Sequence, residues 1–153
     1  MEETRGLWRG KCVDSGEMVQ GIKLYFPNNL YAIITTEPLG SGRIVLTGKY
    51  VVNPSTLGEC TCGTDKTGKL AFEGDLVEDE FDVAIGVIRY GEYKQPFNDD
   101  KFTKHIGFYV DWIEGDDRDL LRVDLGYWLP LVKIIGNIHD NPEPLKGANN
   151  DNE

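Results

Sequence analysis

Three cysteines and two histidines are the residues of this chain whose types could bind a metal. Cys60 and Cys62 form a Cys-x-Cys pair, and Cys12, His105 and His139 could act as further zinc ligands. Structural zinc sites normally use cysteine pairs with two to four residues between them and a second pair, which this sequence lacks. The spacing therefore favours free thiols in a β-turn region, and we expect neither a metal nor a cofactor.

Carboxylates offer a second chemistry, in which Glu73, Asp75 and Asp111 would act as acids and His139 as a base. The chain has 26 acidic residues, so most of them must be solvated surface charges, and no Ser-His-Asp, Cys-His or spaced carboxylate signature stands out. Asp75 directly follows Gly74, so we expect its carboxylate to accept hydrogen bonds from the local backbone. The sequence assigns no catalytic residue, and an enzyme using clustered carboxylates stays open as an alternative.

Aromatic residues offer a third chemistry, the stacking of a ligand or a partner. Alternating aromatics in strands usually belong to a core, but Tyr127 and Trp128 are adjacent and precede Pro130. Two neighbouring residues of a strand point to opposite faces, so one of this pair is predicted to be exposed. Tyr127 and Trp128 are therefore a candidate partner surface.

Composition restricts the function classes further. Lys and Arg total 16 against 26 Asp and Glu, which gives a formal charge of −10 and argues against direct nucleic-acid binding. No apolar run of about 18 residues is present, so no membrane span is expected. The N-terminus is charged and lacks the apolar segment of a signal peptide, and an odd number of cysteines does not suit a disulfide framework. These features predict a soluble cytoplasmic protein with reduced thiols.

Short apolar runs separated by Gly, Asn, Asp and Pro predict a first β lobe. Residues 22–26 and 30–36 form a hairpin across Pro-Asn-Asn, since Pro presets φ and Asn tolerates the left-handed region. Two further strands, 43–46 and 50–52, flank Thr-Gly-Lys, and the lobe ends near residue 57. The pattern contains no convincing helix in this half.

The second lobe, from residue 58 to residue 146, begins with the polar turn DKTGK at residue 65. AFEGDLV is predicted to be one strand with Phe72 and Leu76 facing inward, and AIGVIRYG the next. Residues 92–104 are expected to form a loop, because they contain Pro96 and few aliphatic side chains. HIGFYVDWI resumes as a strand. Its inward face would carry Ile106, Phe108, Val110 and Trp112.

The C-terminal part combines one ambiguous segment with a clear strand. Residues 116–124 suit a short helix as well as a strand. LGYWLPLVKIIGNI is predicted to be a strand, Asn141-Pro142 would start a short helical turn, and residues 147–153 are expected to be a disordered tail. The chain is therefore expected to be mainly β, with small barrel-like or sandwich-like sets of strands in two lobes and little helix.

Three phrases of the chain stand out, in this order: RGK followed by SGEMVxG at 9–21; VNPxTLG, DKxGK and FEGDLV at 52–77; and IIGNIHDNPE at 134–143. Together they resemble the YopX family of small proteins encoded by bacteriophages and prophages. The resemblance runs nearly end to end and implies one domain over residues 1–146. Cys60 and Cys62 stand where the family usually has Tyr and Gly, so the resemblance implies no thiol function.

The residue types of these phrases suit a structural role, because glycine allows bulges and close backbone approach while Asp and Asn form turns and caps. The motif residues are Arg9, Gly10, Lys11, Gly16, Glu17, Asp65, Gly68, Glu73, Gly74, Asp75, Gly136, Asn137, Asn141 and Pro142. The resemblance implies a mainly β homo-oligomer from a phage genome whose biochemical role is uncharacterised.

We therefore expect a phage or prophage accessory protein that acts by binding or self-assembly, to itself or to a host protein. The alternative is an acidic decoy that occupies the basic groove of a host nucleic-acid-binding or defence protein, since the charge of −10 would steer it there. The sequence names neither the ligand nor the host partner.

Overall fold

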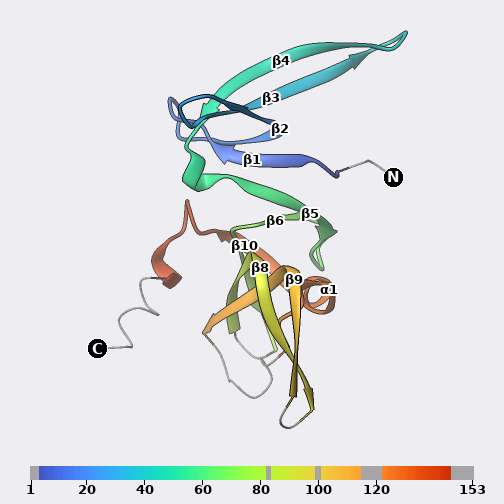
Figure 1. Ribbon diagram of the computed structural model, residues 1–153, viewed down its shortest axis with the longest axis vertical. Helices are drawn as coiled ribbons and strands as arrows, with labels where there is room; N and C mark the ends of the chain where they lie inside the picture. Colours follow the sequence, from blue (N-terminus) through green and yellow to red (C-terminus); the bar gives the residue numbers. More distant parts are fainter. Residues whose placement is uncertain (1–3, 82–83, 99–100, 115–121, 146–153) are drawn as a thin grey trace. The chain divides into compact units, whose positions relative to one another are not determined.

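The computed structural model of the chain describes residues 4–81, 84–98, 101–114 and 122–145. The chain divides into two compact units, Met1–Cys60 and Thr61–Glu153. Nearly all of the regular structure is strand, so the predicted mainly β class is confirmed. Figure 1 shows the strands of both units and the few short helical turns near the C-terminus.

The first unit is one antiparallel sheet with the strand order β4-β3-β2-β1-β5. Its strands are β1 (Leu7–Lys11), β2 (Met18–Phe26), β3 (Leu30–Leu39), β4 (Arg43–Val52) and the start of β5 (Gly58–Thr64), with the 3₁₀ turn η1 (Pro54–Thr56) before β5. The predicted hairpin of β2 and β3 is confirmed by the pairing of Phe26 with Leu30. Asn28 and Asn29 have φ of 68° and 58°, the left-handed conformation that Asn tolerates.

The remaining strand predictions for this unit need correction. Residues 43–46 and 50–52 belong to one strand, β4, because Gly48 continues the ladder opposite Thr35. A register shift between Thr35 and Thr36 marks a β-bulge, which absorbs the extra residue without ending the strand. Strands β1 and β5 were not predicted. Cys60 and Cys62 lie in β5, so their predicted place in a β-turn region was wrong.

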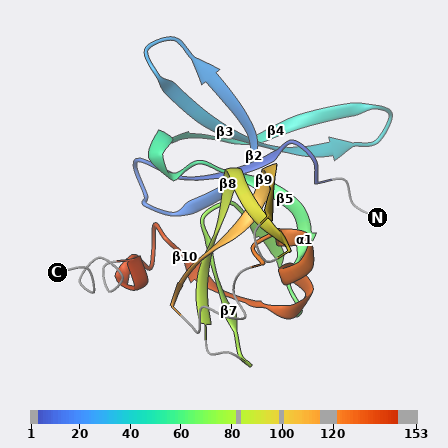
Figure 2. The same ribbon diagram turned by 60° about the horizontal axis from the view of Figure 1, so that its bottom comes forward.

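The second unit is built on a four-stranded sheet with the order β10-β7-β8-β9. Its elements are β6 (Leu70–Phe72), β7 (Asp75–Asp79), β8 (Ala84–Asn98), β9 (Lys101–Glu114), α1 (Leu125–Trp128), the 3₁₀ turn η2 (Leu129–Leu131) and β10 (Lys133–Asn137). Thr61 in the second half of β5 donates a side-chain hydrogen bond to the Ala71 carbonyl of the neighbouring β6. Figure 2 shows β7, β8 and β10 from a second direction.

The core of the second unit lies between this sheet and the short helices. Phe108 and Trp112 pack against it from β9. Phe72 and Leu76 are each 1 % exposed, as the sequence predicts for these two side chains. The buried core cluster consists of Ala71, Val77, Ala84, Ile88, Val110, Leu125, Trp128, Leu129, Val132 and Ile134.

Three predictions for the second unit were wrong. AFEGDLV is two strands, because the chain turns at Gly74 and passes from one sheet to the other. Residues 92–104 are not a loop, since the described part continues the β8–β9 hairpin with Tyr93 opposite His105 and Gln95 opposite Thr103. Ile106 is 77 % exposed, because the hairpin extends beyond the core that covers Phe108 and Val110.

The C-terminal strand prediction was also partly wrong. Residues 125–131 are helical, because Asp124 caps Tyr127 N–H and Pro130 occupies the first turn of η2, where its missing N–H costs nothing. Only Lys133–Asn137 is a strand. Residues 143–145 form the predicted helical turn, whereas residues 115–121 and the tail from residue 146 lie outside the described residues.

Candidate functional site

The DKTGK motif is a turn organised by one carboxylate. Asp65 is 5 % exposed, and its Oδ1 accepts hydrogen bonds from Thr67 N (2.8 Å), Thr67 Oγ1 (2.6 Å) and Lys69 N (3.0 Å). Its Oδ2 accepts from Ile134 N at 2.8 Å, which ties the turn to β10. Burial opposes ionisation of this carboxyl, but the hydrogen bonds from Ile134, Thr67 and Lys69 outweigh it and lower the pKa to about 2. Asp65 therefore stays ionised at neutral pH and serves the structure.

The FEGDLV motif forms the corner between β6 and β7. Gly74 has a φ of 92°, and its backbone donates to Ile88 O and accepts from Ile138 N. Asp75 is 1 % exposed, and its Oδ2 accepts a hydrogen bond from Phe72 N at 2.8 Å. This is the local backbone partner that the sequence predicts for Asp75.

The C-terminal motif is a tight turn held by amide side chains. Asn137 Oδ1 accepts hydrogen bonds from His139 N (3.0 Å) and Asp140 N (2.9 Å), and Asn141 N donates to Asn137 O (2.8 Å). A Cβ at Gly136 would clash with Asn141 Oδ1, so any other residue there would displace the Asn141 side chain. Ile134 and Ile138 bring this motif to Asp65 and to Gly74 respectively.

The N-terminal motif and the VNPxTLG phrase meet in the first unit. Arg9 lies opposite Gly58, and Lys11 N donates to Thr56 Oγ1 at 2.8 Å. Asn53 Oδ1 caps η1 by accepting from Ser55 N at 3.1 Å. Motif residues that are far apart in sequence are thus joined by hydrogen bonds within each unit, which is what a structural role requires.

A shallow cleft of about 390 Å³ opens beside these residues. It is lined by Lys11, Cys12, Val13, Gly16, Asn53 and Pro54. Hydrogen bonds from the backbone and hydroxyl of Ser15 and from the backbone of Asp14 lower the pKa of the Cys12 thiol. Cys12 and Cys60 are buried and Cys62 is exposed, and no group of three potential metal ligands occurs in the part of the chain that the structure describes.

The candidate partner surface at Tyr127 and Trp128 is split by the helix that carries it. Trp128 is 5 % exposed and belongs to the core, whereas Tyr127 is 44 % exposed. The Arg122 guanidinium lies 4.4 Å from the centre of the Tyr127 ring and forms an ion pair with Asp124 at 2.8 Å. One aromatic of the pair, Tyr127, is therefore exposed, as predicted. The two side chains differ because they lie on different sides of the helix α1, not on opposite faces of a strand.

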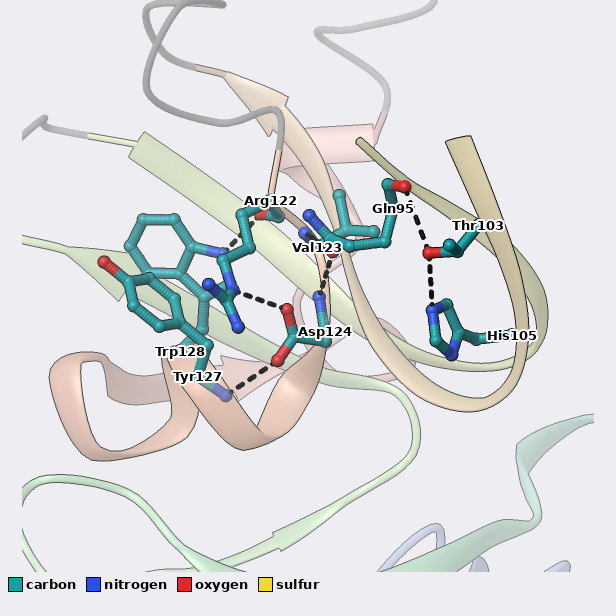
Figure 3. Close-up of polar contacts among 8 residues, drawn as sticks. All are labelled: Gln95, Thr103, His105, Arg122, Val123, Asp124, Tyr127 and Trp128. Atoms are coloured by element: carbon teal, nitrogen blue, oxygen red, sulfur yellow. Dashed lines mark hydrogen bonds and ion pairs between the residues drawn. The ribbon is translucent and has the colours of Figure 1, made fainter. Parts of the chain in front are cut away.

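Polar side chains of the β8–β9 hairpin hold the segment that leads into α1 (Figure 3). Gln95 Oε1 accepts hydrogen bonds from Val123 N (3.0 Å) and Asp124 N (3.4 Å). Thr103 Oγ1 lies 2.8 Å from His105 Nε2, and the His105 ring stacks on Tyr93 with 5.3 Å between centres. Burial, with Asp124 nearby, raises the pKa of Tyr93. These contacts position the segment that leads into α1.

An exposed apolar surface lies elsewhere, on one face of the first unit. The register of β2, β3 and β4 places seven large apolar side chains on the same side of the sheet, each between 37 % and 69 % exposed. We call this surface the apolar face. Its large exposed apolar side chains are Ile22, Leu24, Phe26, Leu30, Ile44, Leu46 and Val51, and the same register places Lys49, opposite Ile34, on this side as well.

Sequence reasoning missed the apolar face, although a signal for it was present. The runs Leu24-Tyr25-Phe26 and Ile44-Val45-Leu46 are apolar at consecutive positions of a strand, so both faces of the sheet must carry apolar side chains. A sheet with one solvated face normally alternates apolar and polar residues. The departure from alternation indicated a second covered face.

The two units also differ in charge. The first unit contains six acidic and six basic residues, whereas the second contains 20 acidic and ten basic residues. The whole formal charge of −10 therefore resides in the second unit. Within the described residues, no helix is long and apolar enough to span a membrane.

The fold and the motif geometry define a mainly β protein whose signature residues form turns, caps and backbone hydrogen bonds. A family model described as YopX protein matches residues 8–146, and the chain belongs to the YopX family. A search of curated proteins finds no significant match.

Proposed function

We propose that this member of the YopX family is a phage or prophage accessory protein that acts in the host cytoplasm by binding, as a self-assembled homo-oligomer. The observation that carries the proposal is the apolar face, whose seven side chains are 37–69 % exposed. Contiguous apolar patches of more than a few hundred Å² are rare on monomeric proteins and mark interaction sites. Binding through this face explains why strands of the first unit are apolar on both sides.

Two of the three carboxylates considered for catalysis, Asp75 and Asp111, have partners that suit a structural role. Asp75 accepts from the Phe72 backbone, and Asp111 forms an ion pair with Arg89 at 3.1 Å. These partners support binding over the enzymatic alternative.

Light scattering coupled to size exclusion tests the self-assembly. We expect an oligomeric mass at micromolar concentration, and we expect the association to strengthen as salt is raised from roughly 0.1 M to 0.5 M. Salt screens the repulsion between second units that each carry a charge of −10, and it leaves apolar burial intact. A monomer under all of these conditions would refute self-assembly.

The charge division favours a second candidate function, an acidic decoy that binds the basic groove of a host protein. A neutral unit joined to a unit with a charge of −10 concentrates the negative potential on one part of the chain. Binding to a basic partner weakens as salt rises, opposite to the expected self-association. A pull-down from host lysate in roughly 0.1 M and 0.5 M salt separates the two, and no basic partner at low salt ends this candidate.

A further inference from the structure

The two faces of the first sheet differ in how they are covered. On one face, Ile33 and Val52 are 0 % and 1 % exposed, and Lys23 lies 3.5 Å from the centre of the Trp8 ring. On the other face, Leu24 lies opposite Ala32, which lies opposite Val51, and Phe26 lies opposite Leu30. Beyond the bulge, Leu46 lies opposite Thr36 and Ile44 opposite Pro38, so the same face continues along β4. Figure 1 shows β3 and β4 as a long paired ribbon beside β2.

The size of the apolar face matches what a stable dimer needs. Its seven side chains expose on the order of 700 Å² per copy, so burying two copies removes about 1,400 Å², within the range of stable specific interfaces. Strand β4 is also the last strand of this sheet. Its C-terminal end is occupied, because Cys12 bridges Val52 and Val13 N donates to Val51 O, but a partner could instead add a strand along the rest of this edge. The bulge opposite Thr35 and the cations Arg43 and Lys49 on β4 are the features by which natural sheets prevent edge pairing.

Charge favours a second copy as the occupant of this face. The first unit has equal numbers of acidic and basic residues, so two first units approach without net repulsion. An isologous interface needs a self-complementary surface, and the seven apolar side chains meet that condition because identical apolar surfaces attract each other. Lys49, on the same side opposite Ile34, has a long side chain that can extend its ammonium group to the rim of the contact. A strongly acidic or basic partner would find no opposing net charge here.

We propose that two copies of this chain pack apolar face against apolar face about a two-fold axis, forming a sandwich of two sheets about 10 Å apart. The inference rests on the proposed self-assembly and specifies its interface. The second units, which carry all of the net charge, are not required for this contact. Leu46 and Ile44 are buried in the dimer, whereas Val45 between them points to the opposite side.

Neighbouring residues of β4 provide a matched pair of variants. Leu46 is 51 % exposed and belongs to the apolar face, while Val45 is 41 % exposed on the other side, opposite Glu37. Dimer dissociation constants of the wild type, Leu46→Lys, Ile44→Lys and Val45→Lys are measured by sedimentation equilibrium under reducing conditions. We expect Leu46→Lys and Ile44→Lys to raise the dissociation constant at least about 30-fold, and Val45→Lys less than about threefold, because only the first two bury a charge.

The outcomes distinguish failure of the proposed self-assembly from failure of the proposed interface. A monomeric wild type refutes the self-assembly itself. A wild-type oligomer that survives Leu46→Lys and Ile44→Lys, or that Val45→Lys weakens equally, refutes only the apolar face as its interface. Circular dichroism with thermal melting verifies that each variant folds. Because Ile44 is 69 % exposed, its replacement remains a usable test if Leu46→Lys disturbs the sheet.

Discussion

The two units of this chain differ in how the faces of their β-sheets are covered. The second unit covers its sheet with its own helical turns, and Trp128 and Leu129 of those turns are 5 % and 7 % exposed. Over residues 4–60 the first unit has no helix except η1, and one face of β2, β3 and β4 keeps its apolar side chains exposed. The apolar face is therefore the part of the first unit that the chain itself leaves exposed. The difference teaches where on the chain the proposed second copy would pack.

The two units also differ in what substitutions of their residues are expected to change. In the second unit, Asp65, Asp75 and Asn137 bind backbone groups and fasten its turns to its strands. These hydrogen bonds are internal to the unit. Substitutions in the second unit should therefore cost folding stability, and substitutions on the apolar face should cost association.

The largest effect is expected at Asp65. Its folded pKa of about 2 lies below the ordinary value of 3.8, so its ionised form contributes roughly 2 to 3 kcal/mol to the free energy of unfolding at neutral pH. Because folding lowers this pKa, the contribution is present above about pH 4, falls as pH drops, and is lost below about pH 2. Asp65→Asn should lower the free energy of unfolding by roughly 2 to 3 kcal/mol at pH 7 and flatten the acid limb, measured by urea denaturation from pH 2 to 7. Equal acid limbs in wild type and variant would contradict this role.

The second-largest effect is expected at Gly136, where Gly136→Ala should lower the free energy of unfolding by about 2 kcal/mol. The new Cβ would lie 2.3 Å from Asn141 Oδ1, and the backbone φ of 157° disfavours a side chain. Gly107→Ala is the matched control, because no atom lies within 4 Å of a Cβ there. Thermal melting of both variants tests the contrast, and equal melting temperatures would show that the C-terminal turn does not constrain β10.

Asp75→Ala should cost about 0.5 to 2 kcal/mol, because Phe72 N loses a buried acceptor. The matched control is Asp111→Ala, which removes an ion pair with Arg89 whose side chains are 47 % and 38 % exposed. An exposed pair contributes roughly 0 to 1 kcal/mol, so the control should lie at the lower end. Urea denaturation measures both, and a stability unchanged by Asp75→Ala would reopen its assignment to catalysis.

The smallest effect on folding is expected on the apolar face. Leu46→Lys should change the free energy of unfolding of the dilute monomer by less than about 0.5 kcal/mol, since Leu46 is 51 % exposed. Denaturation at a protein concentration below the dissociation constant isolates this term from association. A loss of several kcal/mol would mean that Leu46 supports the first unit itself and that the contrast between the units fails.

Local chemistry explains which predictions succeeded. The Asn28-Asn29 turn, the DKTGK turn and the inward Phe72 follow from conformational preferences and alternation within a few residues. The predictions for residues 92–104 and 125–131 failed because contacts with distant parts of the same chain determine the structure of those segments. Tyr93 and Gln95 are held in a strand by His105 and Thr103 across the hairpin, and Trp128 is drawn into the core of the second unit.

The sequence by itself determined the mainly β class, the family and the local backbone partner of Asp75, because each depends on residue types at short range. Only the tertiary structure decided that Asp65 reaches Ile134, 69 residues away, and that Ile44, Leu46 and Phe26 share one uncovered face. Strand register and bulges set which side chains share a face, and both arise from pairing between strands. A linear pattern carries no information on which face remains uncovered, since that depends on what the rest of the chain has packed against it.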